Sequence, residues 1–568
     1  MKRKNVKEIE KTEQITAADK LNIRDGIIML VFVIIYAALL FFRLGSSAAP
    51  QSGYIIPADN TDGIVLTFDE KVSIDKACIY LGHTATVHLN IDATTDGGAA
   101  WEPISVKHAV DKAFYWNTVV LNSEMNGMRI THIGKNVQIM ELVFLDKEGN
   151  TIVPSNIDAY PELFDEQDLY VSEPTYYHHT MFDEIYHART AYEFINGYEI
   201  YEITHPHLGK SIMTLGIRLF GMTPFGWRFM CVIFGLLAVP LMYLMAFHFT
   251  RKRDVTVLAT ILLCTQFMHF TLSRIGTIDV IVSLFIMLMF YFMARFVDAL
   301  KKGRSLKRQF LELFICGCAT ACAVSTKWTG LYAMAGIGVI FFACLIPQYI
   351  SEGWTDETNK KLLILGGFCV VVFVVLPLGA YITSFAPMLK MYPDKNIFQI
   401  AEANSRYMLN YHSNISQYHI YASKIYEWLL GRGALVDASA RVGNKMSYVV
   451  TLGSPFIAIT GLAALVHNLY LWFKKKDTSA KILSIAYFAM VLPWVFISRT
   501  QFVYQYYVCT LLLGLLIANS VNQFKDAKRK RTIIIIAVVS AVFFAIFYPV
   551  ISGMLVSPRM FNYLLFWN

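Results

Sequence analysis

Two adjacent carboxylates, Asp183 and Glu184, stand directly before a segment with helical periodicity, and His187 follows within one turn. Residues three or four apart lie on one face of a helix, so the imidazole can meet either carboxylate. A carboxylate in this setting can act as a general base on a hydroxyl group or bind a divalent cation. The pair is therefore a candidate catalytic site, and an acid pair on a solvated surface is the alternative.

A second group, His205, His207 and Lys210, precedes another apolar run. Pro206 between the two histidines is typical of the entry to a helix. Because the N-terminus of a helix favours an anion, His205 and Lys210 are candidate substrate ligands. A stiffened turn without a ligand is the alternative.

Three cations, Arg274, Lys327 and Arg499, lie at the edges of apolar runs. A charge at membrane depth is costly and is a functional candidate by default. Three such groups that converge would suit the phosphate at the head of a membrane lipid, whereas isolated ones would be snorkelling anchors. Asp279 is a candidate structural partner of Arg274.

A fourth group, His412, His419 and Trp428, lies in a stretch rich in tyrosine. Aromatic rings at this density suit stacking on a sugar, but they also suit the packing of a long loop. The spacing leaves both interpretations open.

The elements that must position these residues are membrane helices. Hydrophobic residues make up 55% of the 568 residues and charged residues only 16%, against about 25% charged residues in soluble proteins. This composition excludes a cytosolic enzyme, a disordered protein and a fibrous one. The apolar stretches are continuous rather than alternating, which favours helices over an outer-membrane barrel.

The net charge of +8 is concentrated in short segments that flank apolar runs, which indicates cytoplasmic loops rather than a surface for nucleic acid. Residues 45–223 are mainly acidic. The nine cysteines show no disulfide framework and no zinc-binding spacing. We therefore expect no metal and no cofactor, with a divalent cation on the acid pair as the open alternative.

The sequence predicts about eleven transmembrane helices and an inserted β-sandwich-like domain outside the membrane. The predicted parts are a cytoplasmic segment (1–25), a first helix (26–44), the β-rich domain (50–155), an external loop with the acid pair (156–223), helices two to seven (224–384), a second external loop (385–446), helices eight to eleven (447–551) and an external tail (552–568). One of the eleven apolar runs is 255–272, and another is 447–472.

In their order along the chain, these residues resemble the protein O-mannosyltransferase family, glycosyltransferase family 39, of the GT-C class. The acid pair is similar to the family's Asp-Glu motif, and residues 205–210 (HPHLGK) are similar to its His-Pro-Pro-Leu-(Gly/Ala)-Lys motif, with His207 in place of the second proline. Further matches lie at 274–279, 325–330, 411–428, 452–455 and 493–507. The lack of room for a β-trefoil in 385–446 suggests a bacterial type with an undecaprenyl-like carrier, whereas the extra domain at 50–155 is unusual for the family and leaves the identity of the acceptor open.

The resemblance implies a GT-C fold and transfer of a sugar, in this family mannose, from a polyprenyl-phosphate carrier to Ser or Thr hydroxyls of exported proteins. The implied partners are this donor, the hydroxyl acceptor and the lipid bilayer, with an active site on the extracytoplasmic side of the cell membrane. The implied roles are a base (Asp183), an orienting acid (Glu184), donor phosphate ligands (Arg499, Lys327, Arg274) and ligands of sugar or substrate (His187, His205, Lys210, His412, His419, Trp428).

Three alternatives remain open at this stage. The acceptor could be a glycolipid or a cell-wall polymer. The chain could instead be a transporter or flippase of lipid-linked sugars, although no inverted repeat with broken helices is evident in the sequence. It could also be a sugar-binding membrane receptor that uses 50–155 as its sensor.

Overall fold

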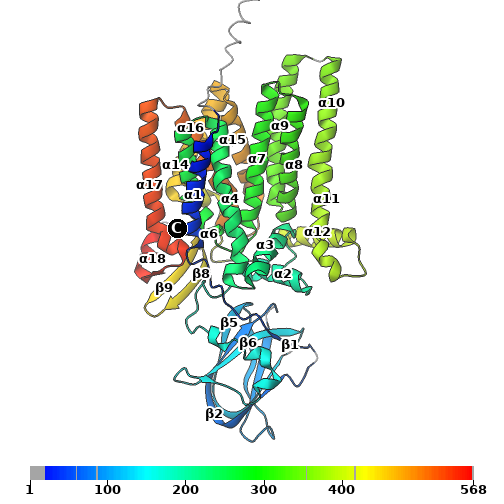
Figure 1. The fold of residues 1–568 in the computed structure, drawn as a ribbon, viewed down its shortest axis with the longest axis vertical. Helices are drawn as coiled ribbons and strands as arrows, with labels where there is room; N and C mark the ends of the chain where they lie inside the picture. Colours follow the sequence, from blue (N-terminus) through cyan, green and yellow to red (C-terminus); the bar gives the residue numbers. More distant parts are fainter. Residues whose placement is uncertain are drawn as a thin grey trace, which may run out of the picture.

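The computed structural model describes residues 20–58, 60–84, 87–132, 134–353, 355–414 and 417–565. A bundle of long helices stands above a separate β-domain, and the chain enters the bundle from the end opposite that domain (Figure 1). Most of the predicted cytoplasmic segment and the last three residues of the predicted tail lie outside the described residues.

Ten helices in the described part are long and apolar enough to cross a membrane. Their bounds are α1 (Ile23–Phe41), α4 (Pro224–Thr250), α7 (Asp279–Lys301), α8 (Leu306–Thr326), α9 (Thr329–Glu352), α10 and α11 counted as one (Asp356–Val370 and Leu376–Thr383), α14 (Pro455–Lys475), α15 (Thr478–Phe496), α16 (Tyr507–Asn522) and α17 (Asp526–Ser552). The chain is thus a multi-pass membrane protein.

The predicted run 255–272 is interrupted, so the count of eleven stays a prediction. Helix α5 (Arg253–Cys264) and helix α6 (Phe267–Leu272) are separated by Thr265 and Gln266. The Thr265 hydroxyl lies 2.6 Å from that of Ser540, and Gln266 Oε1 accepts from the Ser454 amide at 3.4 Å. The polar residues at the break therefore bond to neighbouring segments.

The starts of the long helices follow from local sequence. The Asn22 side chain accepts from the Arg24 amide at the start of α1. Thr223 caps α4 and Ser454 caps α14, each followed by a proline at the first helical position, where the missing N–H has no cost. The prediction that a helix covers 447–472 is wrong at its beginning, because 445–451 is a strand and α14 starts at Pro455.

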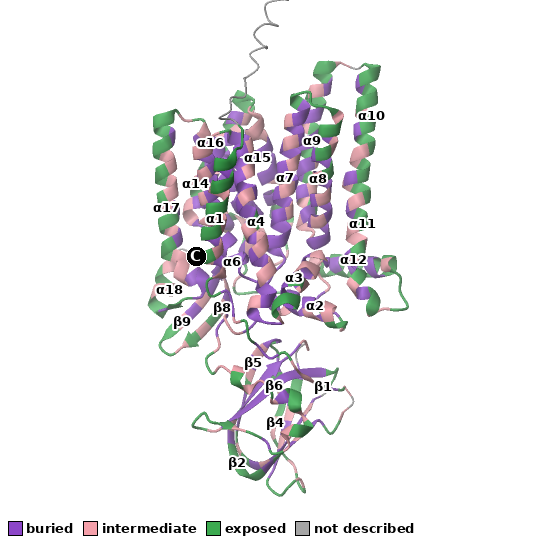
Figure 2. Ribbon diagram, viewed as in Figure 1, coloured by how far each residue is buried: buried purple, intermediate pink, exposed green. Residues whose placement is uncertain are grey.

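Burial separates a central group of helices from a lipid-facing one. In the span that contains α16, 89% of the most apolar stretch is buried inside the protein. The corresponding share is only 17% in α17 and in α1. Figure 2 shows the outer helices α1, α10 and α17 as largely exposed. Apolar side chains exposed over such lengths are typical of contact with hydrocarbon.

The β-rich domain predicted at 50–155 is present, but its described strands form one antiparallel sheet rather than two. The order is β1-β6-β2-β5-β3-β4, with β7 beside β6. The strands are β1 (Tyr54–Ile56), β2 (Ile64–Leu81), β3 (Val87–Thr94), β4 (Glu102–Val110), β5 (Tyr115–His132), β6 (Val137–Leu145) and β7 (Thr151–Ile152). The long strands β2 and β5 contain register shifts, and such bulges bend a sheet.

Strand β6 connects the domain to the bundle. All its residues are buried. Val137, Ile139 and Phe144 pack in the core of the domain, whereas Met140 and Val143 belong to the large apolar cluster that includes the membrane helices. The sheet is therefore anchored on the bundle through the second face of this strand.

The two long external loops carry structure of their own. The first contains α2 (Glu184–Asn196) and α3 (Leu208–Phe220), and the second contains α12 (Ile397–Asn414), α13 (Ile425–Trp428) and β8 (Leu435–Val442). Strand β9 (Lys445–Thr451) lies between β8 and β10 (Leu555–Val556), and α18 (Pro558–Leu565) follows. These elements gather at the end of the bundle that faces the β-domain (Figure 1).

Candidate active site

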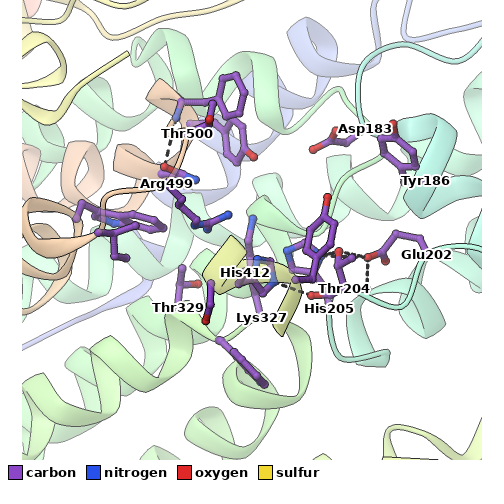
Figure 3. Close-up of a pocket in the computed structure, with 18 of the residues that line it drawn as sticks. Asp183, Tyr186, Glu202, Thr204, His205, Lys327, Thr329, His412, Arg499 and Thr500 are labelled. Atoms are coloured by element: carbon purple, nitrogen blue, oxygen red, sulfur yellow. Dashed lines mark hydrogen bonds and ion pairs between the residues drawn. The ribbon is translucent and has the colours of Figure 1, made fainter. Parts of the chain in front are cut away.

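A cavity of about 410 Å³ lies where these loop elements meet the ends of the membrane helices. Five separate segments contribute to its wall, and Figure 3 shows their polar side chains pointing into a common space. The lining includes Asp183, Tyr186, His187, Glu202, Thr204, His205, Lys327, Trp328, Tyr332, Tyr411, His412, His419, Trp494, Arg499 and Tyr504. Most of the residues predicted from the sequence are thus brought together.

Asp183 is directed into the cavity by a turn directly before α2. Phe182 adopts φ 46°, in the left-handed region that non-glycine residues rarely enter. Its ring packs edge-on against Tyr504 at 5.6 Å between centroids. Unfavourable backbone angles persist where the surroundings fix them, and they cluster at functional sites.

The surroundings of Asp183 shift its proton affinity. Burial raises the pKa of its carboxyl group to about 7, against the opposing effect of the Lys327 ammonium. An ordinary aspartate is a much weaker base. A carboxylate with a pKa near the working pH is suited to accept a proton from a hydroxyl group.

Glu184 does not line the cavity. Its two oxygens receive Arg228 Nε at 2.7 Å and Nη2 at 2.8 Å, and they also accept from the amides of Gly276 and Met181. Glu184 and Arg228 are both fully buried. The predicted contact of Glu184 with the acceptor is therefore not what the geometry favours. Glu184 instead holds the turn beneath Asp183. Because both Glu184 oxygens are already bonded, Asp183 and Glu184 are not placed to bind a divalent cation together.

Glu202 is the centre of a second polar network. Lys210 Nζ donates to Glu202 Oε2 at 2.5 Å, His205 Nδ1 lies 3.3 Å from Oε1, and His187 Nδ1 lies 3.8 Å from Oε2. Burial alone would raise the pKa of Glu202, but Lys210 and the two histidines hold it well below the usual value. Glu202 is therefore a permanent anion in the wall of the cavity.

His187 and His205 are uncharged at neutral pH. Burial lowers the pKa of His187 to about 3 and that of His205 to about 4, despite the nearby Glu202. His412 Nε2 donates to the Thr204 carbonyl at 2.8 Å, and its ring lies 5.4 Å from that of His205. His419 lines the cavity at its far side beside Phe502. Neutral imidazoles offer hydrogen bonds to hydroxyl groups without adding charge.

Two of the three predicted phosphate ligands reach the cavity. Lys327, which follows α8, forms an ion pair with Asp279 Oδ1 at 2.7 Å, and Arg499, which follows α15, lines the same cavity. Arg274 is buried elsewhere and donates to the backbone carbonyls of Phe42 and Arg43. The expected partner of Arg274, Asp279, thus belongs to Lys327, and the predicted phosphate role of Arg274 is not supported.

Two further predicted ligands lie behind the wall rather than in it. Lys210 is completely buried, and its ammonium group donates to the Glu202 carboxylate and to two backbone carbonyls. Trp428 is 1% exposed, and its indole N–H donates to Ser423. Both support the site from outside, so neither is placed to touch a substrate.

Sequence reasoning missed Glu202 and Tyr504. Glu202 stands three residues before His205, which is the spacing that puts a carboxylate near an imidazole in a turn. Tyr504 lies in an aromatic run (residues 502–507) whose members looked alike in the sequence. Its ring is 5.2 Å from Lys327 Nζ and packs on Phe182, so it joins the acid side of the cavity to the basic side.

Comparison with known proteins agrees with this arrangement. The model of the dolichyl-phosphate-mannose-protein mannosyltransferase family matches residues 220–392. The chain is 22% identical over 461 residues to a polyprenol-phosphate-mannose–protein mannosyltransferase of Mycolicibacterium smegmatis, covering 69% of this chain and 88% of the relative. A protein of the same name from Mycobacterium tuberculosis is 22% identical over 67% of this chain and 85% of its own length.

The fold is shared with a solved structure, the Saccharomyces cerevisiae protein O-mannosyltransferase Pmt1-Pmt2 complex bound to the sugar donor. The TM-score is 0.58 at 12% identity, over 68% of this chain and 88% of that one. The motifs collected in one cavity, the family match over residues 220–392 and the related sequences all agree with the resemblance to the protein O-mannosyltransferase family, and the chain shares the fold of the yeast enzyme.

Proposed function

We propose that this chain transfers a mannosyl group from a polyprenyl-phosphate carrier to a Ser or Thr hydroxyl of exported proteins. The observation that carries the proposal is that Asp183 shares one cavity with Lys327 and Arg499, although the three residues come from distant parts of the chain. A base that faces two cations across a cavity is the arrangement that this transfer needs. The names of the mycobacterial relatives support mannose and a polyprenol carrier.

The reaction follows from these positions. The acceptor oxygen forms a bond to the anomeric carbon while the bond from that carbon to the phosphate oxygen breaks. Asp183 takes the proton of the acceptor hydroxyl, and the electron pair leaves with the polyprenyl phosphate. Arg499 and Lys327 stabilise the negative charge that develops on the phosphate. Attack from the side opposite the phosphate inverts the anomeric configuration.

The remaining polar residues suit recognition of the sugar. His187, His205 and His412 are neutral and line one wall, where they can exchange hydrogen bonds with hydroxyl groups. Tyr411 and Trp328 from the same wall offer apolar ring faces. A sugar needs both kinds of contact, because its rim is polar and its faces are apolar.

The proposed site faces the outside of the cell membrane. The basic segments 301–308, 474–481 and 525–531 lie at the helix ends away from the cavity, and cytoplasmic loops carry such an excess of Lys and Arg. The lipid tail of the donor would remain in the bilayer while its charged head stays at the interface. An exported acceptor would meet it there.

The test is transfer from polyprenyl-phosphate mannose to a Ser/Thr-rich peptide by the full chain in lipid nanodiscs, with mass spectrometry of the peptide. Asp183→Asn should abolish transfer, and Asp298→Asn, at an exposed carboxylate on α7, should not. Full activity of Asp183→Asn would overturn the proposal. If a glycolipid is mannosylated while the peptide stays unchanged, the acceptor is a lipid rather than a protein. If the donor moves across vesicle membranes and no sugar is transferred, the chain is a flippase.

A further inference from the structure

A cluster of three carboxylates lies outside the active-site cavity, at the junction between the β-domain and the bundle. Glu141 in β6, Asp165 and Glu166 each place an oxygen within 4.8 Å of the other two. None of the three lines the catalytic cavity. The cluster joins a strand of the β-domain to the segment that leads from this domain back towards the bundle.

The carboxylates have no cation partner in the described part of the chain, where no Lys, Arg or His forms an ion pair with them. Glu141 is fully buried, and its Oε1 has no hydrogen-bond partner, while Oε2 accepts from the Glu166 amide at 2.8 Å. Burying a charge without a partner is strongly unfavourable. The unpaired buried oxygen therefore calls for a ligand that the protein chain does not supply.

The hydrogen bonds of the cluster organise the carboxylates rather than neutralise them. The Ser52 hydroxyl donates to Asp165 at 2.8 Å, and the Gln51 amide donates to Glu166 Oε2 at 2.6 Å. Each of these donors is neutral, so none of them supplies a positive charge to the cluster.

The ligand set has the chemistry of a hard cation site. Ca²⁺ binds carboxylate, carbonyl and water oxygens at 2.3–2.6 Å and accepts irregular geometry, whereas Mg²⁺ demands a near-ideal octahedron. The cluster offers only oxygen atoms, from one buried, one half-buried and one exposed carboxylate. The exposed side can be completed by water. This set fits Ca²⁺ better than a transition metal, which would favour nitrogen or sulfur ligands.

We propose that Glu141, Asp165 and Glu166 form a Ca²⁺ site that fastens the β-domain to the membrane body. The site lies beside the chain that enters the domain at Gln51 and Ser52. The Gln51 side chain in turn accepts from the Met222 amide at 2.9 Å and donates to its carbonyl at 3.2 Å, directly before α4. A bound cation would thus connect strand β6 with the segment that enters the β-domain (Gln51 and Ser52), the segment that leaves it (Asp165 and Glu166) and the start of a membrane helix.

The test uses the full chain in nanodiscs, stripped of metal with a chelator and titrated with Ca²⁺ alone by calorimetry, with thermal unfolding followed in parallel. We expect saturable binding with a Kd of about 10⁻⁴–10⁻³ M, as in extracellular Ca²⁺ modules, and a rise in Tm on saturation. Glu141→Gln should weaken binding at least tenfold and remove the Tm shift. Glu162→Gln, at an exposed carboxylate nearby, should change neither.

Two outcomes would overturn the proposal. The first is no saturable Ca²⁺ binding to the wild-type chain. The second is that Glu141→Gln binds Ca²⁺ with the affinity of the wild type, which would mean that the Glu141 carboxylate is not a ligand. If Glu141→Gln fails to fold, Asp165→Asn at the exposed position keeps the test decisive, because unchanged Ca²⁺ affinity in that variant would also contradict the site.

Discussion

The ammonium group of Lys327 lies 2.7 Å from Asp279 Oδ1, whereas Arg499, which lines the same cavity, has no carboxylate at ion-pair distance in the described part of the chain. The two cations are therefore not equivalent. The charge of Lys327 is largely balanced before any donor arrives, and the charge of Arg499 is not. Arg499 is the stronger attraction for an incoming phosphate.

Arg499→Ala should raise the KM for the polyprenyl-phosphate donor about 10- to 100-fold, the range that loss of one charge-assisted hydrogen bond predicts. Its Tm should stay unchanged, because Arg499 forms no ion pair with any residue that the structure describes. Lys327→Ala should lower Tm as well as activity, since Asp279 is left buried without its cation. Steady-state kinetics and thermal unfolding check both variants against Arg406→Ala on the exposed face of α12. An unchanged donor KM for Arg499→Ala would contradict the phosphate role.

The pH dependence of transfer should reflect Asp183, whose pKa is raised to about 7 by burial. Only the ionised carboxylate accepts a proton, so kcat/KM should fall as pH decreases below 7 and level off above about 8. Asp183→Asn should lower kcat about 10²- to 10⁴-fold, the usual contribution of a general base, and should abolish this acidic limb. A variant that retains the limb would assign it to a different group.

Glu184 should prove to be a stability residue. Glu184→Gln leaves the Arg228 guanidinium buried without its counterion, and breaking a buried pair in this way destabilises by about 3–5 kcal/mol. The double variant Glu184→Gln with Arg228→Met should recover much of the lost Tm, because no unpaired charge remains. Thermal unfolding of the single and double variants is the measurement. If Glu184→Gln alone has the wild-type Tm but no activity, Glu184 takes part in catalysis and is not a stability residue.

The sequence predicted the membrane bundle well, because hydrophobic length and flanking charge are local properties. It was less successful at 255–272, where Thr265 and Gln266 look unremarkable among apolar neighbours but bond sideways to Ser540 and Ser454. Such lateral bonds depend on which segments become neighbours. The same limit applies to the β-domain, where β2 and β5 continue through register shifts and the strands form one sheet instead of the predicted sandwich.

The site could be predicted in part for a similar reason. Asp183, Lys327 and Arg499 were recognisable because charged residues next to apolar runs are unusual. The sequence could not tell which charges already have partners. Glu184, Lys210 and Arg274 are charged too, but each is bonded within the protein. Glu184 pairs with Arg228, Lys210 pairs with Glu202, and Arg274 donates to backbone carbonyls. Only the three-dimensional arrangement separates a charge that holds the fold from a charge that is available to a substrate.

Replacing Lys210 should make the stability of the protein depend on pH, because Lys210 holds down the pKa of its partner Glu202. In the wild type the pKa of Glu202 is held well below its usual value, so its ion pair stabilises the protein above about pH 4.5 and is lost as pH falls through the depressed pKa. In Lys210→Met, burial acts on Glu202 without the ammonium and raises its pKa instead. The variant should therefore be strongly destabilised at pH 7, and the deficit should narrow as pH is lowered towards 5.

Thermal unfolding of the chain in nanodiscs between pH 5 and pH 8 measures this deficit. Lys302→Met is the matched control, because its ion pair with Asp298 is solvent-exposed and should contribute no more than about 1 kcal/mol at any pH. The donor KM of any folded Lys210→Met protein should stay close to that of the wild type, since Lys210 does not line the cavity. A Tm deficit independent of pH, or a wild-type Tm with a raised donor KM, would place Lys210 in substrate binding after all.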